Sequence, residues 1–121
     1  MARRRKSEVF ALDTLLAARA AAKTPYFEFL RVRDLSAGLY VLAAGSVDRQ
    51  TPHTEDELYL LLSGRAQLRV GQVSTPVGAG SLLYVRAGQA HAFHSIVEGL
   101  KALVIFGPAE RKRRWRPVTA R

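Results

Sequence analysis

The sequence predicts an all-β, antiparallel domain preceded by one short helix. From Tyr26 onward, short runs rich in Val, Leu, Tyr and Phe alternate with glycine-containing turns at even spacing. Evenly spaced short strands of this kind are typical of an antiparallel sandwich or barrel. No long helical segment follows Pro25, which argues against a parallel sheet built from strand–helix–strand units.

Length and composition agree with a single globular domain. The chain has 121 residues, of which 48% are hydrophobic and 24% charged, and this length supports one core rather than two. Cysteine is absent, which excludes disulfides and thiolate metal sites. The chain has no run of about 18 apolar residues, the length that predicts a membrane span. Ser7 and Glu8 also interrupt the apolar stretch that a signal peptide needs behind its basic start, so we expect a cytoplasmic protein without membrane contact.

The first element is a helix, predicted over residues 9–24, after a tail over 1–8. The segment is rich in alanine and leucine, which favour helices, and Asp13 is a candidate N-cap. Thr24 ends the helix, since the residue before a proline avoids the helical conformation. The predicted β-domain then covers residues 25–109.

Short strands are expected throughout the β-domain. Turn signals separate them, among these Ser63-Gly64, Gly71-Gln72 and Glu98-Gly99. The expected strands cover residues 26–33, 37–44, 57–62, 65–70, 73–77, 81–85, 91–97 and 100–106.

The run from Leu58 to Leu62 is apolar on both alternating faces. One face of such a strand can line the interior, and the other needs cover from a second sheet, the helix or another subunit. Symmetric dimers are the commonest oligomers, so we expect a homodimer.

The formal net charge of +9 is concentrated at the two ends of the chain. Between Ser7 and Glu110, nine Lys and Arg residues stand against ten Asp and Glu residues, so the body is nearly neutral and the basic residues lie in tails over 1–8 and 110–121. Such tails either attract nucleic acid or another polyanion, or are solvated ends. Trp115 is the one aromatic residue among these charges and no nucleic-acid motif accompanies it, which favours solvated ends.

The three histidines are the main candidates for chemistry. His53 and Glu57 stand four apart, so on an extended strand both side chains lie on the same face. His91 follows a turn further along, whereas His94 faces the other way and is expected at the surface or an interface. Imidazole and carboxylate ligands together suit Fe(II), Mn(II), Ni(II) or Zn(II). Without further signals, a histidine on a strand is more often a satisfied polar group than a ligand.

The spacing of these residues resembles the two signature motifs of the cupin superfamily. Gly45-x5-Thr51-x-His53-x3-Glu57-x6-Gly64 resembles the first, in which His-x-His precedes a glutamate. Gly80-x5-Arg86-x-Gly88-x2-His91-x3-Ser95 resembles the second, with Arg86 and Ser95 in place of the family's proline and asparagine. The resemblance covers about residues 37–106 and implies a jelly-roll barrel, the double-stranded β-helix, with one divalent metal ion inside.

The resemblance implies that His53, Glu57 and His91 are the metal ligands. The family's first histidine falls at Thr51, a poor ligand for a transition metal, which leaves two histidines and one carboxylate. Non-haem Fe(II) oxygenases use this set and keep open positions for water, substrate or dioxygen. The missing ligand equally indicates weak or absent metal. Two oxygen donors stand nearby, but simple alternation from His53 points neither inward unless a bulge intervenes; these are Asp48 and Gln50.

Alternation also predicts which side chains line the interior beside these ligands. The expected lining residues are Tyr40, Thr51, Tyr59, Phe93 and Ser95. An apolar, partly aromatic chamber with a few polar groups suits a small organic ligand. The same aromatic side chains would equally serve to fill the barrel.

Three functions are compatible with these observations. The first is a metal-dependent enzyme, in which the ion is a Lewis acid or, as iron, activates dioxygen; dioxygenases, isomerases and decarboxylases occur among proteins similar to this one. The second is a module that binds or senses a small molecule without chemistry, as the missing first histidine also indicates. The third is polyanion binding through the basic tails. The fold does not decide between them, because one barrel hosts many activities.

Overall fold

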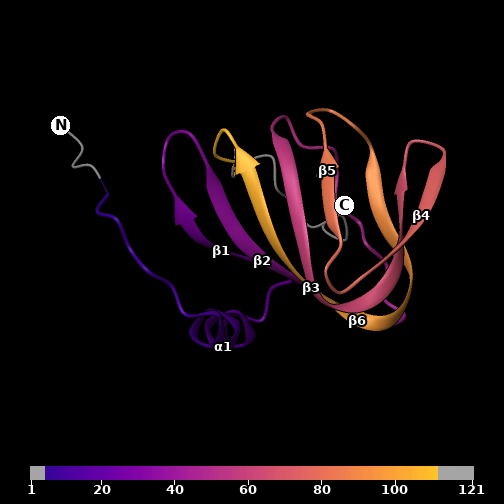
Figure 1. Ribbon diagram of the computed structural model, residues 1–121, viewed down its shortest axis with the longest axis horizontal. Coiled ribbons are helices and arrows are strands. Elements are labelled where there is room, and N and C mark those ends of the chain that lie inside the picture. Colours follow the sequence, from indigo (N-terminus) through magenta and orange to yellow (C-terminus); the bar gives the residue numbers. More distant parts are fainter. Residues whose placement is uncertain (1–4, 112–121) are drawn as a thin grey trace.

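The computed structural model describes residues 5–111, which form one helix and six strands (Figure 1). In chain order the elements are α1 (Leu12–Ala22), β1 (Tyr26–Arg31), β2 (Ser36–Leu42), β3 (Asp56–Val70), β4 (Val73–Gly78), β5 (Leu82–Val85) and β6 (His91–Gly107). Every strand pairing is antiparallel, which confirms the predicted all-β class with a short N-terminal helix. Most residues of the two predicted basic tails lie outside the described residues.

The two longest strands, β3 and β6, pair with each other and belong to both halves of the sheet. In one half the strand order is β1-β2-β6-β3-β5, and in the other half β3 lies between β6 and β4. Among the described strands, the path from β1 to β4 does not close on itself. The predicted jelly-roll barrel is therefore an open one, folded over as a double-stranded β-helix (Figure 1).

A close approach of two glycines bends the long strands where they pass from one half to the other. Gly64 has a φ of +100°, and a Cβ there would overlap the backbone of Gly99 on β6. Glycine alone tolerates both the positive φ and the close approach. The turns predicted at Ser63-Gly64 and Glu98-Gly99 are therefore wrong, because each is a bend within one continuous strand, and four predicted strands merge into two.

The buried core lies between the two halves of the sheet. Its largest fully buried side chains include Tyr59, Phe93 and Phe106. The rings of Tyr59 and Phe93 meet edge to face with centroids 5.2 Å apart, a favourable geometry for aromatic pairs. Tyr59 lies on β3 and Phe93 on β6, and these two strands also carry Glu57 and His91 of the candidate site described below.

The N-terminal helix lies outside the sheet, beside β1 and β2 (Figure 1). It begins at Leu12, later than predicted, and ends before Lys23, whose φ of 59° is left-handed. Ala11 occupies the N-cap position and Asp13 lies in the first turn, so the predicted cap is wrong. None of the helical residues is buried. Within residues 5–111, no helix is long and apolar enough to cross a membrane.

The outer face of β5, β3 and β6 is apolar and exposed. Leu58 and Leu60 on β3 pair with Tyr84 and Leu82 on β5, and with further apolar residues on β6. Leu82 is 68% exposed and Tyr84 is 65% exposed. The second apolar face that the sequence indicated is therefore open to solvent in the single chain.

Candidate metal centre

The three predicted metal ligands come together between the two halves of the sheet. His53 lies in the loop before β3, Glu57 lies near the start of β3, and His91 is the first residue of β6. One ligand atom from each lies within 4.8 Å of the other two. All three are buried, with exposed fractions of 5%, 3% and 7%. His53 does not share a strand with Glu57, as the spacing suggested, but the loop delivers it to the same place.

The backbone fixes which nitrogen of His91 faces the site. Nδ1 lies 2.9 Å from the carbonyl oxygen of Gln89, which can only accept a hydrogen bond, so Nδ1 carries the proton. The lone pair of Nε2 then points inward, 3.0 Å from Oε1 of Glu57 and 3.1 Å from the hydroxyl of Tyr59. Within the described part of the chain, this buried Oε1 accepts no hydrogen bond of normal geometry.

These two acceptors fit a bound cation. A lone pair and a carboxylate oxygen repel each other at 3.0 Å unless positive charge lies between them. For metal–ligand bonds of about 2.1 Å, two ligands at right angles are about 3.0 Å apart. In the metal-free protein a proton takes this role: burial lowers the pKa of His91, but the neighbouring Glu57 carboxylate, the Gln89 carbonyl and Asp48 raise it more, so that it lies above its usual 6.5.

The second histidine is held by a carboxylate that the sequence did not identify. Nδ1 of His53 lies 2.9 Å from Oε2 of Glu110, and both side chains are at most 4% exposed. The N–H of Glu110 donates to the hydroxyl of Ser36 at 2.9 Å, and Arg31 donates to its carbonyl oxygen. Among the described residues, Oε2 of Glu110 accepts no hydrogen bond of normal geometry, but a carboxylate this close favours a proton on Nδ1, and that arrangement lets Nε2 bind a metal in place of its own proton. The structure thus places Glu110 inside the folded body, past the expected domain boundary at residue 109.

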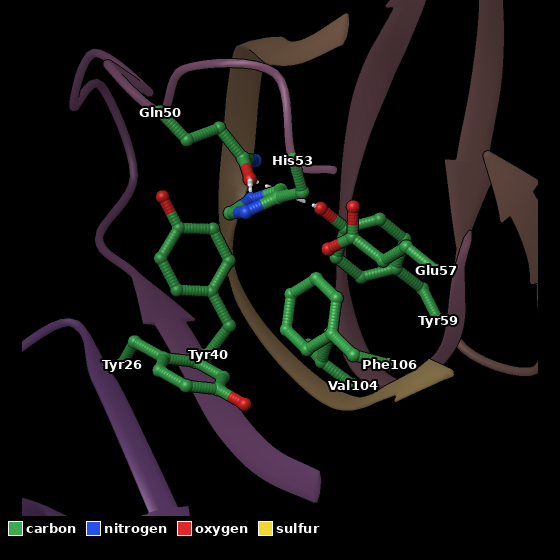
Figure 2. Close-up of a pocket in the computed structure, with 8 residues that line it drawn as sticks. All are labelled: Tyr26, Tyr40, Gln50, His53, Glu57, Tyr59, Val104 and Phe106. Carbon is green, nitrogen blue, oxygen red and sulfur yellow. Dashed lines mark hydrogen bonds between the residues drawn. The ribbon is translucent and has the colours of Figure 1, made fainter. Parts of the chain in front are cut away.

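A small pocket opens beside the ligands (Figure 2). Its cavity volume is about 10 Å³, room for about one water molecule, and its lining residues are Tyr26, Tyr40, Gln50, His53, Glu57, Tyr59, Val104 and Phe106. Tyr40 and Tyr59 were expected there. Burial and the charge of Glu57 raise the pKa of Tyr59 well above its usual 10.0, so its hydroxyl keeps its proton and is a hydrogen-bond donor.

The other expected lining residues lie elsewhere. Phe93 is buried in the core, Thr51 is half-buried, and neither belongs to the pocket lining. Ser95 is exposed, and its hydroxyl lies 3.0 Å from Nδ1 of His94. Its φ of +50° is left-handed, which breaks the alternation of β6, so the expected inward direction of Ser95 is wrong. Nε2 of His94 lies 2.8 Å from the hydroxyl of Ser74.

The side chains of Asp48 and Gln50 reach the interior, although the alternation of side chains along a strand predicted that they point outward. Residues 43–55 form a loop rather than a strand, so alternation does not apply to them. Asp48 is 7% exposed and accepts hydrogen bonds from the hydroxyl of Tyr40 at 2.5 Å and the N–H of Phe93 at 2.9 Å. The side chain of Gln50 reaches the pocket, with Oε1 3.1 Å from Nε2 of His53 (Figure 2).

One family combines these features: regularly spaced glycines, an antiparallel double-stranded β-helix and a group of candidate ligands inside it. The model of the cupin domain matches residues 38–106. The chain belongs to the cupin family. This cupin is 52% identical, over 103 residues, to an uncharacterised protein of Streptomyces coelicolor, a match that covers 85% of this chain and 98% of the relative.

Solved structures agree with this assignment. A conserved protein with a double-stranded β-helix domain from Klebsiella pneumoniae superposes with a TM-score of 0.69 at 18% identity, over 85% of this cupin and 91% of that chain, and shows the fold alone. The DMSP lyase DddQ from Ruegeria pomeroyi superposes with a TM-score of 0.59 at 25% identity, over 63% of this cupin. The match spans only 39% of the lyase chain, so it concerns the barrel that the two proteins have in common.

Proposed function

We propose that this cupin is a metal-dependent enzyme for a small, oxygen-bearing substrate, with one divalent ion held by His53, Glu57 and His91. The observation that carries the proposal is the buried pair of acceptors, Nε2 of His91 and Oε1 of Glu57, 3.0 Å apart. Iron, manganese, nickel or zinc would supply Lewis acidity at this point, and iron would also activate dioxygen.

The pocket as it stands has room for about one water molecule. Its cavity volume of about 10 Å³ is far below the roughly 300–1,000 Å³ of sites for drug-sized ligands, so a substrate of even a few non-hydrogen atoms would displace side chains that line it. The hydroxyl of Tyr59 would donate a hydrogen bond to the substrate, while the rings of Tyr40 and Phe106 exclude water from it. Since the Ruegeria pomeroyi protein is named a lyase, lyase activity is the first to test, ahead of dioxygenase, isomerase and decarboxylase activity.

Metal content tests the site directly. We would purify the full chain without a histidine tag and measure bound metals by plasma mass spectrometry, beside a His53→Ala/His91→Ala variant. His94→Ala is the matched control, because that imidazole bonds to Ser74 and Ser95 and not to the site. We expect near-stoichiometric metal in the parent and the control and none in the double variant. Absence of metal from all three, even after metal is added back, would reject the proposal.

A non-catalytic binding or sensing module is the second candidate, favoured by the small size of the pocket. In such a module, a small molecule would raise the melting temperature with or without metal, because any ligand that binds the folded state alone stabilises it. A rise that depends strictly on metal would count against the module and for the enzyme.

We also propose that a second copy of the chain covers the outer face of β5, β3 and β6. A symmetric dimer would bury Leu82 and Tyr84, which are exposed in the single chain. Light scattering should give a dimer mass for the parent and a monomer mass for Leu82→Glu. A parent that is monomeric at every concentration would contradict this. A cytoplasmic location and solvated rather than nucleic-acid-binding tails stay predictions.

A further inference from the structure

The loop between β2 and β3 carries a second set of polar side chains into the barrel. Asp48 sits at its centre and accepts hydrogen bonds from four donors, the hydroxyl of Tyr40, the N–H of Phe93, and the backbone and side-chain N–H groups of Gln50. This network joins the loop to β2 and β6, so the position of the Gln50 side chain is set by the fold.

Asp48 also decides which end of the Gln50 amide faces the site. Nε2 of Gln50 lies 2.8 Å from Oδ2 of Asp48, and a carboxylate can only accept, so the NH2 group must face it. The amide oxygen Oε1 consequently points at Nε2 of His53, 3.1 Å away, and at the hydroxyl of Tyr59, 3.3 Å away (Figure 2). The Tyr59 hydroxyl donates its one proton to this oxygen, and Nε2 of His91 lies 3.1 Å from the same hydroxyl.

Oε1 of Gln50 lies within hydrogen-bond distance of a proposed metal ligand. An amide oxygen can only accept, so in the metal-free protein Nε2 of His53 donates a proton to Oε1, 3.1 Å away. A metal ion that takes the place of this proton would lie between the two atoms, as it would between Nε2 of His91 and Oε1 of Glu57, which are 3.0 Å apart. Both separations match the spacing of about 3.0 Å for neighbouring ligands of one ion with bonds of about 2.1 Å.

We propose that Gln50 is the fourth ligand of the metal, through an amide oxygen that Asp48 orients. The inference rests on the proposed metal site, and it assigns to Gln50 the role that the cupin motif gives to a histidine at the position of Thr51. Thr51 is not among the residues that line the pocket, whereas Gln50 is. An oxygen in place of an imidazole makes the site harder, which shifts its preference toward Mn(II) and Fe(II) and away from Cu(II).

The test compares the full-length parent with Gln50→Ala and Gln50→Glu, with Gln72→Ala in the exposed β3–β4 turn as the matched control. Binding of Mn(II) to metal-free protein is followed by the electron paramagnetic resonance signal of the free ion, and Co(II) absorption reports the ligand set. We expect Gln50→Ala to weaken Mn(II) binding by at least about tenfold, the lower limit for loss of even an outer-shell partner, and to change the Co(II) spectrum. Gln50→Glu should bind Mn(II) at least as tightly as the parent.

Gln50→Glu separates a ligand from a merely structural residue. Glutamate keeps an oxygen for the metal but has no NH2 to donate to Asp48, so a residue that only braces the loop would lose its role in both variants. Equal weakening in Gln50→Ala and Gln50→Glu would therefore overturn the proposal, as would parent-like Mn(II) binding and Co(II) absorption in Gln50→Ala. If the parent itself binds no metal, the proposed function fails first, and a shared proton bridges His53 and Gln50 instead.

Discussion

Glu110→Gln removes the charge beside His53 while it keeps the shape of the side chain. In the parent, the carboxylate 2.9 Å from Nδ1 can only accept, which favours a proton on Nδ1, so that a metal can take the place of the proton on Nε2. A glutamine amide can instead turn its NH2 group toward Nδ1. The proton then moves to Nε2, and that tautomer cannot bind a metal.

The expected loss follows from the burial of this pair. Loss of an outer-shell partner weakens metal binding by about 10- to 100-fold, which is about 1.4 to 2.8 kcal/mol of binding free energy. The side chains of His53 and Glu110 are only 4% and 3% exposed, so solvent does not readily replace the lost acceptor. We therefore expect a loss near the upper end, about 100-fold.

A competition titration of Zn(II) against a chromophoric chelator measures this loss. Glu98→Gln is the matched control, because that carboxylate is 57% exposed and pairs with Arg65 at the surface. Circular dichroism and the melting temperature of the metal-free proteins report whether Glu110→Gln still folds. A folded Glu110→Gln variant with the dissociation constant of the parent would refute the reasoning.

Three further predictions concern pH, the strand bend and the core. Protonated His91 stabilises the metal-free protein below the unfolded-state pKa of 6.5, and this contribution is lost as the pH rises through its raised folded-state pKa. Bound metal reverses this dependence of stability on pH, because a metal ligand must be a neutral imidazole. The rise in melting temperature on adding Zn(II) should therefore grow between about pH 6 and pH 9. A rise that does not depend on pH would count against His91 as a ligand. Gly64→Ala should lower the free energy of unfolding in urea by more than about 2 kcal/mol. The control is Gly45→Ala, which should lower it less, because Gly45 also has a positive φ but has open space around it. Equal losses in the two variants would mean that the close approach of Gly99 does not matter. Phe93→Ala should cost about 3–5 kcal/mol, since the ring is 2% exposed, and a loss below about 1 kcal/mol would contradict its place in the core.

The candidate metal ligands could be predicted from the sequence because their placement depends on local spacing. Glu57 and Tyr59 share one face of a single strand, and His91 begins the strand that pairs with it. Turn glycines such as Gly88, with a φ of +79°, keep this frame in register. The cupin motif records these local constraints, which is why it located the three residues that the structure brings together.

The supporting residues could not be predicted because they depend on contacts that local patterns do not describe. Asp48 and Gln50 belong to a loop, where alternation has no meaning, and their direction follows from hydrogen bonds to β2 and β6. Glu110 stands next to Arg111 in a run of basic residues, so composition assigned it to a solvated tail. Its burial depends on how the chain returns beneath Ser36 after β6.

The fold therefore determines more than the positions of the ligands, because it also determines which nitrogen of each histidine can bind. For His91 the acceptor is the carbonyl of Gln89, only two residues away in the same segment, so a local turn suffices. For His53 the carboxylate beside Nδ1 belongs to Glu110, at the far end of the described chain, so the preferred position of the proton depends on tertiary structure. The oxygen donors show the same contrast between local and tertiary placement. Glu57 is positioned by its own strand, whereas the Gln50 side chain is positioned by its hydrogen bond to Asp48. If the proposed site binds a metal, a change at Asp48 or Glu110 would thus weaken that binding although it leaves every motif position intact.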